Sequence, residues 1–136
     1  MGTVRWVDDR LPALERLTAE GGTFDFMLCS AVLMHLQASE LAPAFRAMTG
    51  LLEAGGRIAI SLRDEGEHDP RGLFVFHSDG VLRMAAEQAR LRLVRASGSA
   101  DALGRGLRWR LFVFEKPSAK VRRPSGQPGG GQMKIS

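Results

Sequence analysis

One stretch, residues 24–62, constrains the fold of this 136-residue chain more than any other. Two short apolar runs, Phe24–Ser30 and Arg57–Leu62, flank a segment with helical spacing that begins near Ser39 and ends in the turn Gly50–Arg57. Nearly continuous apolar strands separated by an amphipathic helix are typical of a βαβ unit in a parallel sheet that is covered on both faces. The sequence therefore predicts an α/β fold.

The helix expected between the two runs has a single apolar face that should pack in the core. Ser39 is a favourable N-cap, because its hydroxyl can accept a hydrogen bond from a backbone N–H of the first turn. Gly55 and Gly56 then reverse the chain, since glycine readily adopts the positive φ that follows a helix. The apolar residues recur at i, i+4, i+7 and i+11 and are Leu41, Phe45, Met48 and Leu52.

These motifs resemble the second half of a class I S-adenosylmethionine-dependent methyltransferase. The resemblance is carried by the strand Phe24–Ser30, the following segment VLMHL (Val32–Leu36), a helix that ends in LLEAGG, and the strand Arg57–Leu62. It extends from about Val4 to about Glu115. It implies a partial Rossmann-like sheet, mostly parallel with a C-terminal antiparallel strand, in which the two apolar runs are the fourth and fifth strands.

The sequence lacks the N-terminal elements of that fold. Members of the family begin with a strand and a glycine-rich turn that opens a helix, and the cofactor lies across this turn. The sequence has no such element and starts where the resemblance places the third strand, at Val4–Val7. A helix with Pro12 in its first turn should follow and end at Gly21-Gly22. We therefore expect a truncated domain.

Three further elements complete the expected domain. Ser78 is the N-cap of a helix, and the runs Leu91–Ala96 and Leu107–Glu115 resemble the sixth strand and the antiparallel seventh strand. Leu73–His77 is apolar and fits either a short strand or a lid. The core-facing positions of the helix are Val81, Leu82, Ala85, Ala86 and Ala89, and alternation in the last run sets Leu107, Trp109, Leu111 and Val113 against Arg108 and Arg110.

The expected strand order leaves one edge of the sheet open. The order in the family is 3-2-1-4-5-7-6, so the missing first and second strands would separate the third strand from the fourth. An unpaired edge on the fourth strand leaves backbone groups without hydrogen-bond partners, which is unfavourable. Either the third strand closes directly onto the fourth, or another chain fills the gap, or the natural protein is longer.

Residues 116–136 differ in composition from residues 1–115, the expected truncated domain. This tail is rich in Pro, Gly, Ser and Lys and cannot bury enough surface to offset the entropy of ordering, so we expect disorder. It holds five of the 19 basic residues and no acidic residue, which leaves 14 basic and 15 acidic residues in the domain. The domain is therefore nearly neutral, which disfavours nucleic-acid binding.

Composition also bears on the cellular compartment of the protein and on the state of its cysteine. No apolar run approaches the length of a membrane span and no secretory signal is recognisable, so we expect a cytoplasmic protein that makes no membrane contact. The single cysteine, Cys29, excludes an intramolecular disulfide and a cysteine-based metal site. Because it lies within an apolar strand, we expect a small core residue rather than a reactive thiol.

The carboxyl ends of the strands are the expected ligand-binding edge of such a sheet. Ser30, Ala31 and Val32 leave the fourth strand there and are placed to approach a cofactor. In the family, an acidic residue at the end of the third strand usually accepts a hydrogen bond from the adenine amino group, a role that the resemblance gives to Asp8 or Asp9. The alternative is that these two aspartates cap the helix that follows them.

Two further residues are candidates for contact with a substrate. The position of His35 resembles that of a histidine beside the methyl-transfer site of the family, and an imidazole can take a proton from a substrate hydroxyl; the alternative is a packed structural histidine. Arg63 follows the fifth strand and could hold an anionic substrate group or pair with Asp64 or Glu65. The acidic loop beyond it lacks the regular spacing of a metal site, so we expect a solvated loop and no metal.

Two hypotheses follow for the function. The first is an S-adenosylmethionine-dependent methyltransferase with a small-molecule substrate, present as a fragment that binds the cofactor weakly or not at all by itself. Methyl transfer depends on in-line positioning and often needs little acid–base chemistry, so the lack of an obvious catalytic pair is compatible with it. The second is a non-catalytic module, derived from a methyltransferase, that forms a homodimer or completes a partner chain through the exposed strand edge.

Overall fold

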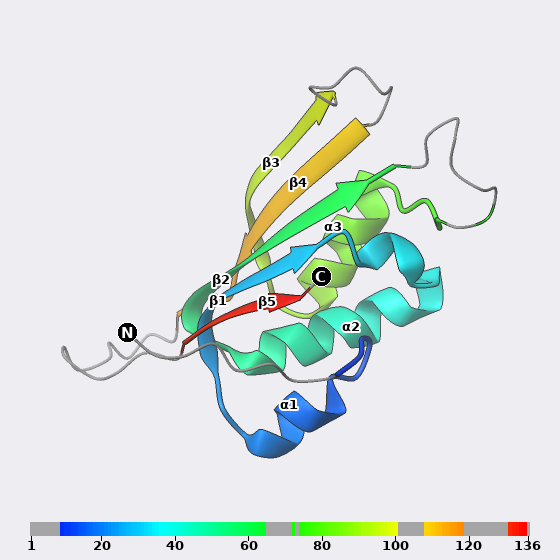
Figure 1. Cartoon of the computed structure of the whole chain (residues 1–136). Helices are drawn as coiled ribbons and strands as arrows, with labels where there is room; N and C mark the ends of the chain where they lie inside the picture. Colours follow the sequence, from blue (N-terminus) through cyan, green and yellow to red (C-terminus); the bar gives the residue numbers. More distant parts are fainter. Residues whose placement is uncertain (1–8, 65–71, 73, 101–107, 119–130, 136) are drawn as a thin grey trace.

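One mixed sheet with helices packed against it forms the described part of the chain. The computed structural model describes residues 9–64, 72, 74–100, 108–118 and 131–135. Among these residues the strand order is β3-β4-β2-β1-β5, and β4 alone runs against the other strands (Figure 1). The fold therefore belongs to the predicted α/β class. The elements are α1 (Glu15–Glu20), β1 (Phe24–Ser30), the 3-10 turn η1 (Leu33–His35), α2 (Ala38–Leu51), β2 (Leu52–Arg63), α3 (Asp79–Gln88), β3 (Arg92–Ala100), β4 (Arg108–Glu115) and β5 (Gly131–Ile135).

The predicted βαβ unit is present. β1 pairs in parallel with β2, so that Met27 lies opposite Ile58 and Cys29 lies opposite Ile60, and α2 connects the two strands. β2 begins earlier than predicted, at Leu52, because the chain already pairs with the start of β1 before the two glycines. This parallel pair fixes the direction in which both strands end.

The strand order agrees with the resemblance on one side of β1 and differs from expectation on the other. β2, β4 and β3 follow β1 in the order expected for the fifth, seventh and sixth strands. On the other side of β1, where a gap was expected, β5 pairs in parallel, with Met133 opposite Met27. A segment of the tail thus covers this edge, an arrangement that is not among the three expected. The predicted strand Val4–Val7 lies outside the described residues.

β5 also differs from the expectation of disorder over residues 116–136. Met133 and Ile135 are half-buried and pack against the core, whereas Gln132 and Lys134 are exposed. This short alternation gives β5 one apolar side, which faces the same way as the buried side chains of β1 because paired residues share a face of the sheet. Residues 119–130 lie outside the described chain.

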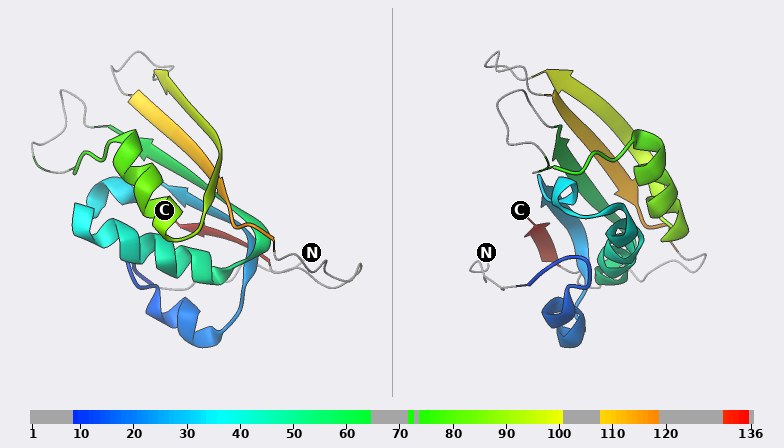
Figure 2. Two further views of the ribbon diagram at one scale, coloured as in Figure 1. Left: turned by 180° about the vertical axis from the view of Figure 1, so that it is seen from behind. Right: turned by 90° about the vertical axis from the view of Figure 1, so that its right-hand side faces the viewer.

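Helices α2 and α3 lie on the same face of the sheet (Figure 2). Phe45 of α2 meets Phe114 edge-on with 5.8 Å between ring centres, and Phe114 stacks on Phe112 at 6.1 Å. The predicted alternation of Leu111 and Val113 against Arg108 and Arg110 therefore does not identify the buried side of β4. Phe112 and Phe114 are buried under the helices, whereas Leu111 and Val113 are only half-buried, because no described helix covers the opposite face.

The helix starts follow the predicted chemistry with two corrections. Gln37 rather than Ser39 is the N-cap of α2, and its N–H donates to the carboxylate of Glu40 (2.8 Å). Ser78 caps α3 as predicted, because its hydroxyl accepts the N–H of Val81 (3.2 Å). The predicted core position of Val81 is wrong, since its side chain in the first turn is 46% exposed, whereas the other predicted core residues of α3 are buried: Leu82, Ala85, Ala86 and Ala89.

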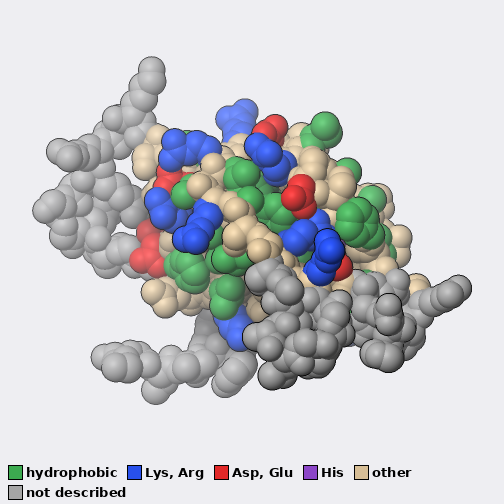
Figure 3. Space-filling view, turned by 90° about the horizontal axis from the view of Figure 1, so that it is seen from above, with side chains coloured by type: hydrophobic (Ala, Val, Ile, Leu, Met, Phe, Trp, Pro, Cys, Tyr) green, Lys and Arg blue, Asp and Glu red, His purple; other side chains and the backbone are tan. Residues whose placement is uncertain are grey.

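The described surface mixes charged and hydrophobic side chains. Seen from above, hydrophobic side chains are interspersed with Lys and Arg side chains (Figure 3). None of the helices in the described ranges is long and apolar enough to cross a membrane. Among the described residues, the large hydrophobic side chains that are exposed are Phe76, Val81, Met84 and Val94.

We expect the double substitution Met133→Asp with Ile135→Asp to detach β5 from β1. Replacing two half-buried apolar side chains by charges should lower the free energy of unfolding by about 1–3 kcal/mol. The opened edge of β1 should then make the chain self-associate. Chemical denaturation and light scattering measure the two effects.

The matched control is Gln132→Glu with Lys134→Glu, on the exposed side of the same strand, which should change neither property. A Met133→Asp, Ile135→Asp variant that remains monomeric and as stable as the wild type would show that β5 does not protect the edge.

Candidate functional site at the strand ends

The carboxyl ends of β1 and β2 lie side by side because these strands are parallel. The hydroxyl of Ser61 donates to that of Ser30 (3.3 Å), and the backbone N–H of Ala31 donates to the carbonyl of Ser61 (2.9 Å). Ala31 has a φ of 56°, in the left-handed region, and turns the chain out of β1. Val32, which follows it, is half-buried against the core and precedes η1. The three residues predicted to approach a cofactor are therefore at the predicted edge.

His35 and Arg63 come together on the ring of Phe74. His35 is exposed at the end of η1, and its ring meets that of Phe74 nearly perpendicularly, with 5.3 Å between centres. The guanidinium of Arg63, the last residue of β2, lies 4.7 Å from the centre of the same ring, within the range of a cation–π contact. We call Ser30, His35, Ser61, Arg63 and Phe74 the strand-end cluster.

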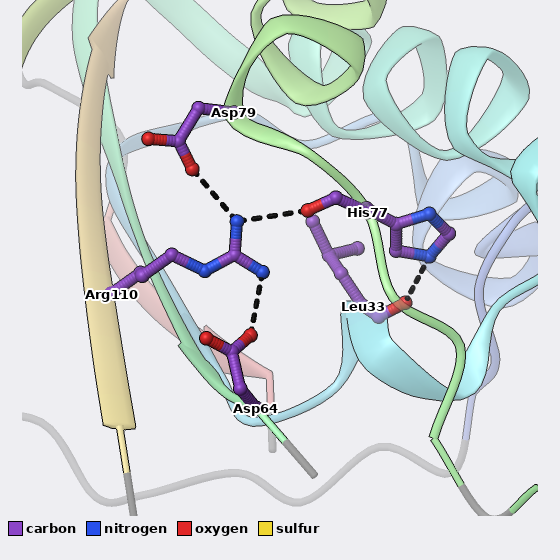
Figure 4. Close-up of polar contacts among 5 residues, drawn as sticks. All are labelled: Leu33, Asp64, His77, Asp79 and Arg110. Carbon is purple, nitrogen blue, oxygen red and sulfur yellow. Dashed lines mark hydrogen bonds and ion pairs between the residues drawn. The ribbon is translucent and has the colours of Figure 1, made fainter.

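A second group of polar side chains lies behind this cluster, on the helix-covered side of the sheet. Arg110 of β4 donates from Nη1 to the carbonyl of His77 (2.8 Å) and to Asp79 (2.7 Å), and from Nη2 to Asp64 (2.8 Å) (Figure 4). The guanidinium is largely buried, with 15% of the side chain exposed. We call Asp64, His77, Asp79 and Arg110 the Arg110 cluster.

Sequence reasoning missed Phe74, His77 and Arg110. One signal was available for Arg110, because it stands in the same alternating register as Phe112 and Phe114 and therefore on the buried side of β4. The segment that holds Phe74 and His77 was predicted as a short strand or a lid, and it forms neither helix nor strand over residues 74–78. Its apolar character gave no indication of its partners.

Asp9 lies at the start of α1, where it binds backbone N–H groups. Its Oδ2 accepts the N–H of Leu17 (2.8 Å), and its Oδ1 accepts that of Arg10 (2.9 Å). Burial alone raises the pKa of Asp9, but the N–H donors of Leu17 and Arg10 outweigh it and hold the pKa below the usual value. The geometry is that of the capping alternative, and the adenine role remains a prediction. Asp8 lies outside the described residues.

Cys29 and the hollow between α1 and α2 lie outside the strand-end cluster. Burial raises the pKa of the Cys29 thiol to about 12, and the side chain has no exposed surface, so it is an unreactive core residue. A hollow of about 360 Å³ lies between α1 and the end of α2, lined by Thr18 and Arg46 among others, away from the strand ends. The described residues contain no group of three or more His, Cys, Asp or Glu side chains that could hold a metal ion.

The described residues do not fit a complete cofactor site. Both carboxylate oxygens of Asp9 accept backbone N–H groups, Oδ2 from Leu17 of α1 and Oδ1 from Arg10 before the helix. β5 occupies the side of β1 where the family has the strand that leads into its glycine-rich turn, and no such turn occurs in the sequence. What remains is the strand-end cluster, whose hydroxyl, imidazole and guanidinium groups can bind a polar or anionic small molecule.

We expect Asp9→Ala to destabilise the protein in a pH-dependent way. A carboxylate with a depressed folded pKa contributes stability above its unfolded pKa, near 3.8, and loses it as the pH falls through the folded value. The Ala variant should be less stable than the wild type at pH 7, by about 0.5–2 kcal/mol as for other lost caps, and the difference should shrink below pH 4. Denaturation curves across this range measure it.

Asp9→Asn is the control for this prediction. Its side-chain oxygen can still accept a backbone N–H, so the cap should persist, whereas the dependence on pH should disappear. Stability differences between the wild type and Asp9→Ala that stay constant from pH 7 to pH 3 would contradict the cap.

Comparison with known proteins places the fold. Residues 4–60 match the family model described as a methyltransferase domain. A comparison with curated protein sequences finds no match. Among solved structures, the magnesium protoporphyrin IX methyltransferase ChlM of Synechocystis PCC 6803, bound to S-adenosylhomocysteine, is similar with a TM-score of 0.59 and 16% identity over 74% of this chain and 48% of that chain.

Two other solved structures are similar to the same extent. The N-methyltransferase NodS of Bradyrhizobium japonicum WM9, in complex with S-adenosyl-L-homocysteine, gives a TM-score of 0.55 and 19% identity over 71% of this chain and 48% of that chain. The [4+2]-cyclase SpnF gives 0.56 and 15% over 72% and 51%. The chain thus spans about half the length of these structures. Residues 4–60 thus match a methyltransferase domain, and the strand order β1-β2-β4-β3 is the one expected from the resemblance to S-adenosylmethionine-dependent methyltransferases.

Proposed function

We propose that this chain is the substrate-side portion of an S-adenosylmethionine-dependent methyltransferase that acts on a small molecule. The observation that carries the proposal is the strand-end cluster: His35 and Arg63 meet on Phe74 at the carboxyl ends of the two central strands. The family match over residues 4–60 supports the same reading. In this proposal the protein works in the cytoplasm and does not bind nucleic acid or a membrane.

The strand-end cluster suggests a division of roles. His35 is exposed and held edge-on to Phe74, so its imidazole can accept a proton from a hydroxyl or amine of the substrate. Arg63 supplies a positive charge beside it and binds an anionic group of the substrate. Ser30, Ala31 and Val32 form the side of the site that turns toward the cofactor. The cofactor supplies the methyl group, and the residues described here supply orientation and a proton acceptor.

The alternative function is a non-catalytic module that associates through a strand edge. SpnF, a [4+2]-cyclase with a similar fold, illustrates that the fold alone does not determine the reaction. β5 covers the edge of β1, so a partner chain or a second copy would have to displace β5 in order to pair there. A partner that contributes a glycine-rich strand, turn and helix would unite the two hypotheses, because the enzyme would then be completed by another chain.

The isolated chain should not bind S-adenosylmethionine or S-adenosylhomocysteine with low-micromolar affinity. The glycine-rich turn is absent and Asp9 is engaged in a helix cap, so the adenosyl group lacks its main contacts. Isothermal titration calorimetry of the full chain with each ligand measures this. Saturable binding at low-micromolar concentration would mean that the strand-end residues hold the cofactor alone, and would overturn the fragment part of the proposal.

Activity should appear when the chain is joined to a strand–turn–helix segment that restores cofactor binding, measured as release of S-adenosylhomocysteine with candidate small molecules. In that protein His35→Ala should lower kcat by about 10²–10⁴-fold, the usual contribution of a general base. Arg63→Gln should chiefly raise KM for anionic substrates. Arg46→Gln, an exposed change on α2 remote from the strand ends, is the control. Full activity of His35→Ala would remove His35 from the mechanism.

A further inference from the structure

Residues 74–78 form the connection that leads into α3, and they form neither helix nor strand. Phe74 lies on this connection. The backbone N–H of Val75 donates to the carbonyl of Met34 (2.7 Å), which places the connection directly on η1, the turn that holds His35. One backbone hydrogen bond allows an irregular segment to pivot, so the position of the Phe74 ring depends on additional contacts.

His77 makes the second link to η1. Its side chain is 2% exposed, and its Nε2 lies 3.1 Å from the carbonyl oxygen of Leu33 and 3.0 Å from that of Leu36. Carbonyl oxygens only accept hydrogen bonds, so Nε2 must carry a hydrogen and donate it. The ring therefore holds the first residue of η1 and the residue after its last, on either side of His35.

Arg110 makes the third link, from the sheet to the same connection. It binds the backbone carbonyl of His77, and it also binds Asp64 after β2 and Asp79 at the start of α3. One guanidinium thus fixes both ends of the chain segment that joins β2 to α3. A planar guanidinium with several N–H groups can serve these acceptors together, whereas a lysine has a single nitrogen for all of them.

We propose that Arg110 and His77 are positioning residues of the candidate site, which keep Phe74 in contact with His35 and Arg63. Arg110 sets the connection against the sheet, and His77 sets it against η1. Neither side chain belongs to the strand-end cluster; each acts through the backbone on which the cluster is mounted. The inference rests on the proposed function only in that the strand-end cluster is taken to bind the substrate. The contacts themselves require neither cofactor nor substrate.

The test is the nuclear Overhauser effect between the ring protons of His35 and Phe74 in the full chain. It should be present in the wild type, whose ring centres are 5.3 Å apart. It should be lost in Arg110→Gln and in His77→Phe, and retained in His77→Gln, because a glutamine amide can still donate to a backbone carbonyl. Arg92→Gln is the control, because Arg92 also pairs with a carboxylate (2.6 Å to Glu115) but lies outside the Arg110 cluster.

Retention of the effect in both Arg110→Gln and His77→Phe overturns the proposal. Where either variant fails to fold, seen as loss of the dispersed methyl resonances of the core, the double variant Asp64→Ala with Asp79→Ala replaces it, because alanine has no side-chain oxygen that could accept from Arg110. That variant removes both carboxylate partners of Arg110, and an unchanged effect there overturns the proposal in the same way. Because the measurement needs no turnover, a negative result leaves the proposed methyltransferase function intact.

Discussion

Burial of the parallel β1–β2 pair beneath α2 is the interaction on which the rest of the structure depends. Met27 and Cys29 of β1 have no exposed surface, and Ile58 and Ile60 opposite them are exposed by at most 1%. Full burial of a Met or Ile side chain contributes about 1.5–3 kcal/mol. Because the two strands point the same way, this apolar pairing also determines that their polar ends emerge together. The strand-end cluster is thus a consequence of how the core is packed.

The sequence was informative where the signal is local. The βαβ unit follows from the spacing of apolar residues within residues 24–62, and the Ser78 cap follows from the chemistry of one hydroxyl. The face of β4 and the order of β5 depend on partners that are distant in the chain. Phe112 and Phe114 are buried because helices cover their side of the sheet. The residues on the other side of β4 are also apolar, so the sequence pattern alone does not show which side is covered.

The candidate site likewise combines residues that could be predicted from the sequence with residues that could not. His35 and Arg63 could be predicted because each follows a strand whose direction the resemblance fixes. Phe74, which joins them, could not, since its segment has no periodicity and its partners lie on two other elements. Arg110 was not predicted as a site residue, although its position in the sequence held a signal. A charged residue in register with two buried phenylalanines indicates a buried polar contact before any partner is known.

The pairing of the first described strand with the last has a consequence for folding during synthesis. During synthesis, β1 leaves the ribosome early and can meet β2 soon afterwards, whereas residues 131–135 emerge only after all the other described elements. Until then this side of β1 lacks the strand that pairs with it among the described residues. The interval between translation of Ser30 and of Gly131 is therefore the period in which an unpaired strand of another chain can compete with β5 for this edge.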